Sequence, residues 1–160
     1  MRVIFLDFDG VLNNGRFLFN HMSDYPDLIM EEKVTLLNDL IERTDARIVF
    51  STSWREEFTL EGLIEILEKV GFKHRDKCIG VTPIAEDNER TTEILEYVKN
   101  NNLDEFVVID DNREEIQNIR SDNKFCTDPN DGLTAEGVAW LVGKFDVLTC
   151  IKEHKDEEEN

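Results

Sequence analysis

The sequence has few cysteines and no paired cysteine motif. Its 160 residues include only Cys78, Cys126 and Cys150, which lie far apart without a CxxC spacing. An odd, sparse set of this kind is typical of reduced, buried thiols in a cytosolic protein. We therefore expect a cytoplasmic location.

Long hydrophobic runs are also missing. The apolar run that begins at Val3 ends at Leu6, because Asp7 follows it, so it is too short for the hydrophobic region of a signal peptide. No stretch approaches the roughly 18 consecutive apolar residues of a membrane span. The sequence predicts a soluble protein without a membrane partner.

Positive charge is scarce. The chain has 18 Lys and Arg residues against 36 Asp and Glu residues, which gives a net charge of −18 at pH 7. Such a surface repels phosphate backbones, so we expect no broad nucleic-acid-binding face. A local basic pocket, or a substrate whose charge is screened by a metal ion, is compatible with this charge. The oligomeric state is left open.

The residues that are present favour one packed domain of ordinary size. Hydrophobic residues make up 40% of the chain, and strand-like and helix-like segments alternate along it without repeats. The expected strands are 3–6, 46–50, 78–81, 106–109 and 124–126, and the expected helices are 30–41, 60–70, 91–98, 114–119 and 134–142. This alternation predicts an α/β fold: a doubly wound three-layer sandwich with a central parallel sheet.

Two segments fall outside this alternation. Residues 13–27 are polar and are predicted to form a loop. Residues 152–160 are an acidic tail that we expect to be frayed or disordered. The expected organisation is a single domain over residues 1–151 followed by that tail.

Polar residues cluster directly after three of the predicted strands. In a parallel sheet the carboxyl ends of the strands meet at one edge, where ligands bind. So many carboxylates at one edge repel one another unless a hard divalent cation such as Mg²⁺ balances them. A basic residue, Arg90, opens the helix that leads into the strand at 106–109 and is placed to reach the same edge. The clusters are Asp7-Phe8-Asp9-Gly10, Ser51-Thr52-Ser53-Trp54-Arg55 and Asp110-Asp111.

Each cluster alone has an ordinary explanation. A lone Asp after a strand is usually a turn former or a helix cap. Core packing for Trp54 and a surface ion pair for Arg55 explain those residues as well as substrate contact does. Turn chemistry explains Asn13 equally well. The three clusters together at one edge are much harder to explain without a function.

The run Asp7-Phe8-Asp9-Gly10-Val11-Leu12 resembles the first signature of the haloacid dehalogenase (HAD) superfamily, most of whose members are phosphatases. Ser51, Arg90 and Asp110-Asp111 resemble the second, third and fourth motifs in the family's order. The third motif more commonly holds Lys, so Lys73, Lys77 and Lys99 are alternatives to Arg90. Ser51-Thr52-Ser53-Trp54-Arg55 and Gly132-Leu133-Thr134 further resemble a small HAD subgroup associated with RNA-repair enzymes. Receiver domains of response regulators carry their acidic pair after the first strand. In this chain the Asp-x-Asp run comes first and the Asp110-Asp111 pair comes late, so the order of the motifs excludes a receiver domain.

The resemblance implies a phosphatase that works through an aspartyl-phosphate intermediate. Asp7 is implied as nucleophile, Asp9 as general acid and base, and Ser51 and Arg90 as partners of the phosphoryl oxygens. Mg²⁺ is implied at Asp7, the backbone carbonyl of Asp9, Asp110 and Asp111. Gly10, Thr52 and Arg55 are further candidates for substrate contact.

Many HAD enzymes insert a cap domain either just after the first motif or between the second and third motifs. In this chain both connections are too short for a folded cap domain. An open site of this kind suits nucleotides, nucleic-acid ends or other bulky phosphomonoesters. The alternative function is a catalytically idle HAD-like module that binds or regulates a partner.

Overall fold

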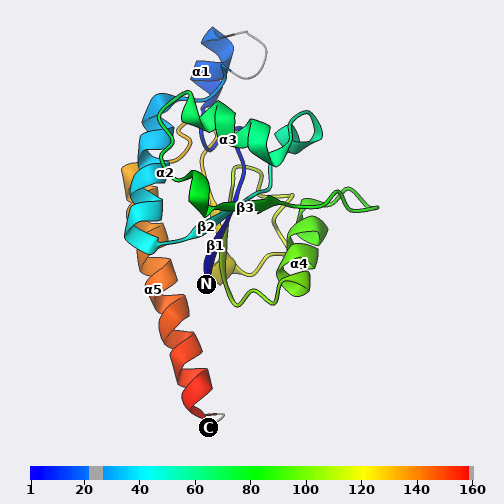
Figure 1. Cartoon of the computed structure of the whole chain (residues 1–160), viewed down its shortest axis with the longest axis vertical. Coiled ribbons are helices and arrows are strands. Elements are labelled where there is room, and N and C mark those ends of the chain that lie inside the picture. Colours follow the sequence, from blue (N-terminus) through cyan, green and yellow to red (C-terminus); the bar gives the residue numbers. More distant parts are fainter. Residues whose placement is uncertain (22–26, 159–160) are drawn as a thin grey trace.

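A computed structural model describes residues 1–21 and 27–158, and its centre is a parallel sheet (Figure 1). The sheet has five strands in the order β3-β2-β1-β4-β5, and every neighbouring pair is parallel. This architecture confirms the predicted doubly wound α/β fold. The strands are β1 (Arg2–Leu6), β2 (Arg47–Phe50), β3 (Cys78–Val81), β4 (Glu105–Asp110) and β5 (Lys124–Cys126).

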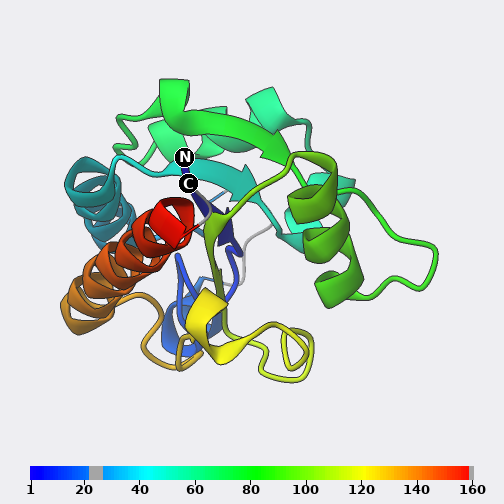
Figure 2. The same cartoon turned by 90° about the horizontal axis from the view of Figure 1, so that it is seen from below.

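Helices cover both faces of the sheet (Figure 2). Three helices, α2 (Glu31–Thr44), α3 (Leu60–Glu68) and α5 (Ala135–Glu158), bury apolar side chains in one large core, whereas α4 (Arg90–Asn100) covers the other face. In α2, the helical spacing of Val34, Leu37 and Ile41 places these side chains on the buried face.

The central strand β1 is buried on both faces, as its unbroken apolar run predicts. Ile4 and Leu6 point into the large core, and Val3 and Phe5 point into the smaller core beneath α4. All four are fully buried, which is typical of a central parallel strand.

The structure corrects two expectations about the connections that follow β1 and β4. The predicted loop 13–27 contains a short helix, α1 (Gly15–Asn20), because the Asn14 side chain caps it by accepting a hydrogen bond from the backbone N–H of Phe17. The helix predicted at 114–119 is a series of turns, in which Ile116 and Ile119 reach the core three residues apart. Part of the predicted loop, residues 22–26, lies outside the described residues.

Helix α5 is longer than its sequence pattern predicts. It begins as expected, with the Thr134 hydroxyl accepting from the N–H of Gly137, but it continues past residue 142 to Glu158. Contacts with the start of β4 hold its second half: Thr149 donates to Glu105, and Lys152 pairs with Asp104 at 2.8 Å. Residues 152–158, which we expected to be frayed, therefore extend a helix, and 159–160 lie outside the described residues.

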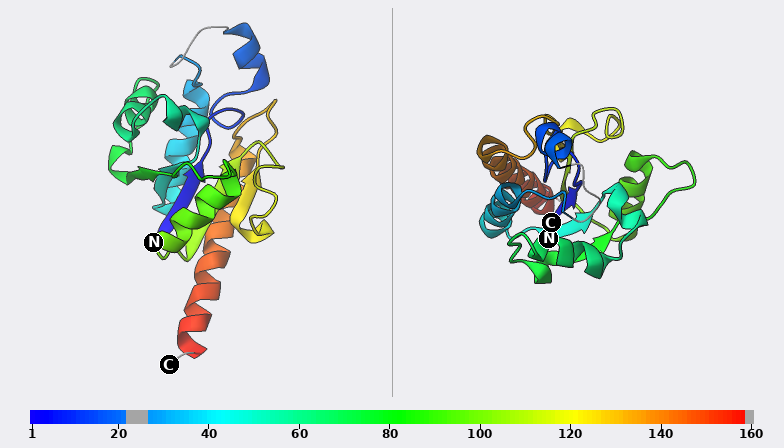
Figure 3. Two further views of the ribbon diagram at one scale, coloured as in Figure 1. Left: turned by 90° about the vertical axis from the view of Figure 1, so that its right-hand side faces the viewer. Right: turned by 90° about the horizontal axis from the view of Figure 1, so that it is seen from above.

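The arrangement of the helices leaves the edge at the carboxyl ends of the strands available for a site. Figure 3 shows α1 beyond the carboxyl ends of the strands, while the second half of α5 projects past their opposite ends. The described residues contain no separate cap domain, as predicted. Among the helices described, none is both long and apolar enough to cross a membrane.

Candidate active site

The sheet register brings the three polar clusters together. Leu6 lies between Phe50 and Ile109 in the sheet, so the next residue along each strand, Asp7, Ser51 or Asp110, lies at the same edge. The backbone N–H of Asp7 donates to Ile109, and that of Ser51 donates to Leu6. These bonds continue the ladder one residue beyond the apolar core, where the side chains begin to be polar.

Three carboxylates meet at this edge. One oxygen each from Asp7, Asp110 and Asp111 lies within 4.8 Å of the other two. Burial raises the pKa of Asp7 well above its usual range, and the nearby charge of Asp110 raises it further. Burial also raises the pKa of Asp110 to about 6, and it raises the pKa of Asp111. The cluster is therefore costly to ionise without a neighbouring positive charge.

Arg90 supplies positive charge from the first turn of α4. Its Nη1 atom donates to the backbone carbonyl of Ser51 and to Oδ2 of Asp110, at 3.0 Å, and it lies 3.5 Å from Oδ1 of Asp7. Its Nη2 atom lies 3.4 Å from Glu115. Burial alone lowers the pKa of Arg90, but the three carboxylates outweigh it and raise that pKa. The guanidinium is thus fixed as a cation beside the cluster.

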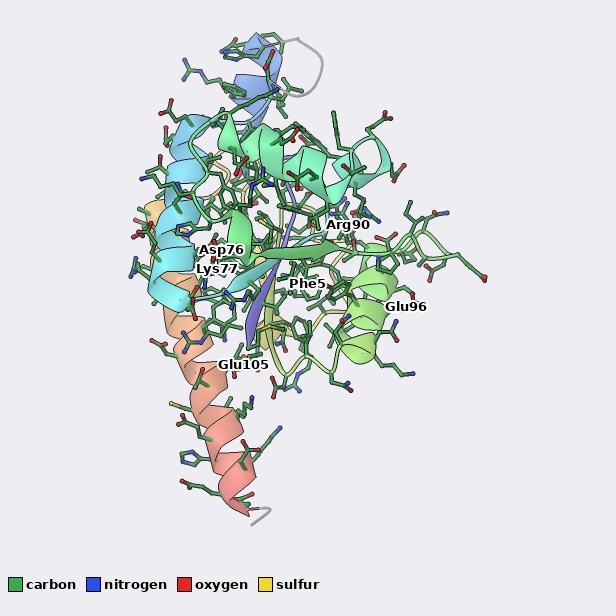
Figure 4. The ribbon with its side chains drawn as sticks, viewed as in Figure 1. Phe5, Asp76, Lys77, Arg90, Glu96 and Glu105 are labelled. Atoms are coloured by element: carbon green, nitrogen blue, oxygen red, sulfur yellow. The ribbon has the colours of Figure 1, made fainter. Side chains whose placement is uncertain are left out.

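The alternative lysines lie elsewhere. Lys77 precedes β3 at the opposite end of the strands and pairs with Asp45, and Figure 4 shows it far from Arg90. Lys73 lines a surface cavity beside α2, and Lys99 lies in the last turn of α4. The geometry favours Arg90 as the basic residue of the cluster.

Removal of Arg90 is expected to affect both activity and stability. Arg90 is the first residue of α4, where a side chain is commonly exposed, but only 11% of its side chain is exposed. Arg90→Ala leaves Asp7 and Asp110 without their counter-charge, so we expect turnover to fall about 10²–10³-fold and stability without metal to fall by about 3 kcal/mol. Phosphatase assays and denaturant titrations in EDTA measure the two effects.

Two variants control this test. Arg90→Lys retains the charge and should recover part of both losses. Arg43→Ala removes an exposed guanidinium that pairs only with Asp39 among the described residues, and it should change neither quantity. Wild-type turnover in Arg90→Ala would contradict the assignment of Arg90 to this site.

The first turn after β1 packs tightly under the cluster. Gly10 is buried with a φ of +72°, and a Cβ atom there would overlap the carboxylate of Asp111. Its carbonyl accepts a 2.7 Å hydrogen bond from the Thr127 hydroxyl. Gly10 therefore lets the turn pass beneath Asp111, and its predicted contact with substrate stays a prediction.

Gly10→Ala tests this packing. We expect the variant to displace Asp111, to weaken Mg²⁺ binding and to lower turnover, in addition to a strain of about 1–3 kcal/mol at positive φ. Gly71→Ala is the matched control, because Gly71 also has a positive φ, +96°, and no described atom lies within 4 Å of the added Cβ. Both variants should lose stability, but only Gly10→Ala should lose Mg²⁺ affinity in a calorimetric titration. Equal Mg²⁺ affinity in the two variants would contradict the role of Gly10.

Asp9 lies beside the cluster and is only partly buried. Its Oδ2 atom accepts a 3.0 Å hydrogen bond from the indole Nε1 of Trp54, and its Oδ1 atom accepts a 3.1 Å bond from the Asn13 amide. The sequence left Trp54 open between core packing and substrate contact, and Asn13 open between turn chemistry and substrate contact. The structure shows that both are fully buried and that both bind Asp9. The sequence signal for Trp54 was its position directly after the hydroxyl residues 51–53, at the edge where the carboxylates gather. A buried indole N–H needs a hydrogen-bond acceptor, and Asp9 supplies it.

Ser51 offers an unused hydroxyl. Its Oγ atom is buried and, among the residues described, has no hydrogen-bond partner. Buried hydroxyls are nearly always bonded in folded proteins, so this one is available to a bound oxygen atom.

Thr52 and Arg55 stabilise the loop after β2. The Thr52 hydroxyl is fully buried and caps the 3₁₀ turn η1 (Ser53–Glu56). The guanidinium of Arg55 is almost fully buried, donates to the carbonyls of Thr52 and Thr82, and forms a 2.6 Å ion pair with Glu93. Internal partners occupy both side chains, and the substrate contacts predicted for Thr52 and Arg55 stay predictions. Arg55 and Glu93 instead join the Ser51 loop to the helix that carries Arg90.

Comparison with known proteins agrees with this geometry. The family model for the HAD domain in Swiss Army Knife RNA repair proteins matches residues 3–138. Comparison with curated proteins and with solved structures finds no significant match. The matched range contains the three polar clusters, Arg90 and every strand of the sheet apart from Arg2, the first residue of β1. The chain belongs to the family of HAD domains found in Swiss Army Knife RNA repair proteins.

Proposed function

We propose that this protein is a Mg²⁺-dependent phosphomonoesterase that works through a phosphorylated Asp7. The observation that carries the proposal is the convergence of a buried carboxylate cluster, a fixed guanidinium and an unpartnered hydroxyl at one edge of the sheet. Carboxylates supply a nucleophile and metal ligands, and the cation and the hydroxyl supply partners for phosphoryl oxygens.

The donor set fits Mg²⁺. The oxygens of Asp7, Asp110 and Asp111 are hard ligands of the kind that Mg²⁺ prefers. Burial, first of all, raises the pKa of each carboxyl, so a bound cation would stabilise the ionised forms. Asp7, Asp111 and the backbone carbonyl of Asp9 would hold the ion, with Asp110 binding it through water or positioning its ligands. When bound, the ion shields the phosphate from the carboxylate that attacks it.

In the first step, a carboxylate oxygen of Asp7 bonds to phosphorus, and the bond from phosphorus to the leaving oxygen breaks. The electron pair of that bond stays on the leaving oxygen, which takes a proton from Asp9. Ser51 donates a hydrogen bond to a phosphoryl oxygen, and Arg90 offsets the charge spread over the others.

In the second step, water bonds to the phosphorus atom held on Asp7. Asp9, now ionised, removes a proton from that water, and the bond between phosphorus and Asp7 breaks. Inorganic phosphate leaves, and both aspartates return to their starting states, so protons and electrons balance over the cycle.

The proposed substrate carries a terminal phosphate on a nucleotide or on a nucleic-acid end. The family supports a phosphorylated substrate connected with RNA repair, and the absence of a cap domain among the described residues leaves the site open to a bulky one. The net charge of −18 disfavours a long groove for a phosphate backbone. Recognition of a terminus fits that charge better than movement along a strand.

A phosphatase screen with Mg²⁺ and with EDTA tests the proposal. The panel contains nitrophenyl phosphate, mononucleotides, oligonucleotides with 3′- or 5′-phosphates, sugar phosphates and phosphopeptides. We expect Mg²⁺-dependent phosphate release, fastest from a nucleotide or an oligonucleotide end. No turnover on any member would favour the alternative of an idle binding module, although the retention of Asp7, Asp9, Ser51 and Arg90 in one cluster favours an enzyme.

A further inference from the structure

We propose that Trp54 is a positioning residue for proton transfer, and that its indole N–H holds the Asp9 carboxyl so that the Asp9 proton is directed to the substrate. The inference rests on the proposed function, in which Asp9 is the general acid and base. It assigns a specific contribution to turnover to a residue that packing alone would explain as part of the core.

The contacts of Asp9 define its orientation. Trp54 Nε1 donates to Oδ2 at 3.0 Å, and Asn13 Nδ2 donates to Oδ1 at 3.1 Å. The orientation of the Asn13 amide is itself fixed, because its Oδ1 accepts from the N–H of Gly10 and its Nδ2 also donates to the carbonyl of Leu28. Both carboxyl oxygens of Asp9 therefore face groups that can only donate.

Donor-only partners have a chemical consequence. An indole N–H and an amide NH₂ cannot accept a proton, so neither Trp54 nor Asn13 can take the Asp9 proton in a hydrogen bond. When Asp9 is protonated, its O–H must donate to an acceptor outside this pair, and in the first step that acceptor is the leaving oxygen. In the second step, the proton of water is accepted by a lone pair of the Asp9 carboxylate that neither Trp54 nor Asn13 occupies.

The indole is rigidly held. Trp54 is fully buried, its ring packs edge-on against Phe8 at 5.2 Å between centroids, and it lies beside Phe58. Its backbone N–H donates to the Thr52 hydroxyl at 3.3 Å. The short loop that presents the Ser51 hydroxyl therefore also fixes the donor to Asp9, so two parts of the reaction centre are positioned by one segment.

Trp54→Phe tests the inference, because it keeps an aromatic ring beside Phe8 and removes the N–H. The first chemical step is measured by rapid quench with two esters, a nucleoside monophosphate and nitrophenyl phosphate. Nitrophenolate leaves readily without a proton, whereas a sugar alkoxide does not. We expect the first step to slow on the order of 10–100-fold for the nucleoside ester and to change little for the nitrophenyl ester.

A double-mutant cycle separates positioning from packing. In the Asp9→Asn background the proton donor is absent, so Trp54→Phe should cause no further loss with the nucleoside ester. Trp140→Phe is the matched control, since Trp140 is the other tryptophan of the chain, is 42% exposed on α5 and packs on Phe125. It should leave both esters unaffected.

A second form of the experiment removes the N–H without changing the shape of the side chain. In the Trp140→Phe background, Trp54 is the only tryptophan, and it can be replaced biosynthetically by benzothienylalanine, which has sulfur in place of the N–H. The replacement should reproduce the loss that depends on the leaving group even if Trp54→Phe folds poorly. Equal slowing of both esters, or a loss that persists in Asp9→Asn, would overturn the role of Trp54.

Failure of this inference can be distinguished from failure of the proposed function. If the wild-type protein hydrolyses no phosphomonoester, or if Asp7→Asn remains active, the phosphatase assignment fails. If the wild-type protein is active, and Asp9→Asn shows the dependence on the leaving group but Trp54→Phe does not, only the inference about Trp54 fails.

Discussion

Asp7→Asn is expected to abolish turnover for every phosphate ester and at the same time to stabilise the metal-free protein. An amide cannot act as the nucleophile, so we expect a loss of roughly 10⁴-fold or more, whatever the leaving group. The gain in stability follows from the raised pKa of Asp7: ionising this buried carboxylate beside Asp110 costs free energy in the folded protein at neutral pH. An asparagine keeps the shape of the side chain and removes that cost.

Activity assays and denaturant titrations in EDTA measure these opposite effects. Asp76→Asn is the matched control, because it is the same substitution at an exposed position before β3, far from the site (Figure 4). It should leave activity unchanged. Retained turnover in Asp7→Asn would remove Asp7 as the nucleophile, and a large loss of stability would attribute the loss of activity to misfolding.

The sequence was sufficient to predict that the polar residues meet at one edge of the sheet, because their meeting depends on strand order and register alone. Apolar runs that are buried on both faces mark β1, β2 and β4, and a parallel sheet brings the residues after each run to one edge. The positions of Asp7, Ser51 and Asp110 follow from that rule, without any information on side-chain packing.

The partners of individual side chains could not be predicted from the sequence, because they lie far away along the chain. Arg55 is occupied by Glu93, which lies 38 residues further along the chain, and no local pattern identifies that pair. Glu93 follows Arg90 by three residues on α4 and so lies on the same side of that helix, which is the one available signal. The extension of α5 likewise depends on contacts with the start of β4, and the hydrophobic pattern of the helix does not contain them.

Removal of Mg²⁺ is expected to abolish turnover and to make stability fall as the pH rises. The folded-state pKa of Asp110 is about 6, against a usual value of 3.8, and the pKa of Asp7 is raised as well. A carboxyl group with a raised folded-state pKa contributes no penalty below its unfolded value and destabilises the fold once it ionises. In EDTA, the free energy of unfolding should therefore decrease between about pH 4 and pH 7, by a few kcal/mol, since one pKa unit corresponds to about 1.4 kcal/mol.

Mg²⁺ should reverse this dependence, because it binds the folded protein and favours the ionised carboxylates. At pH 7 we expect the melting temperature to rise with Mg²⁺ concentration, whereas at pH 4 the protonated cluster should bind little metal and the shift should disappear. Asp111→Ala should weaken the Mg²⁺ response, and Asp110→Asn should reduce the slope of stability against pH in EDTA. Full activity in EDTA would show that these carboxylates do not form an essential metal site. The same slope in Asp110→Asn as in the wild-type protein would show that Asp110 does not cause the pH dependence.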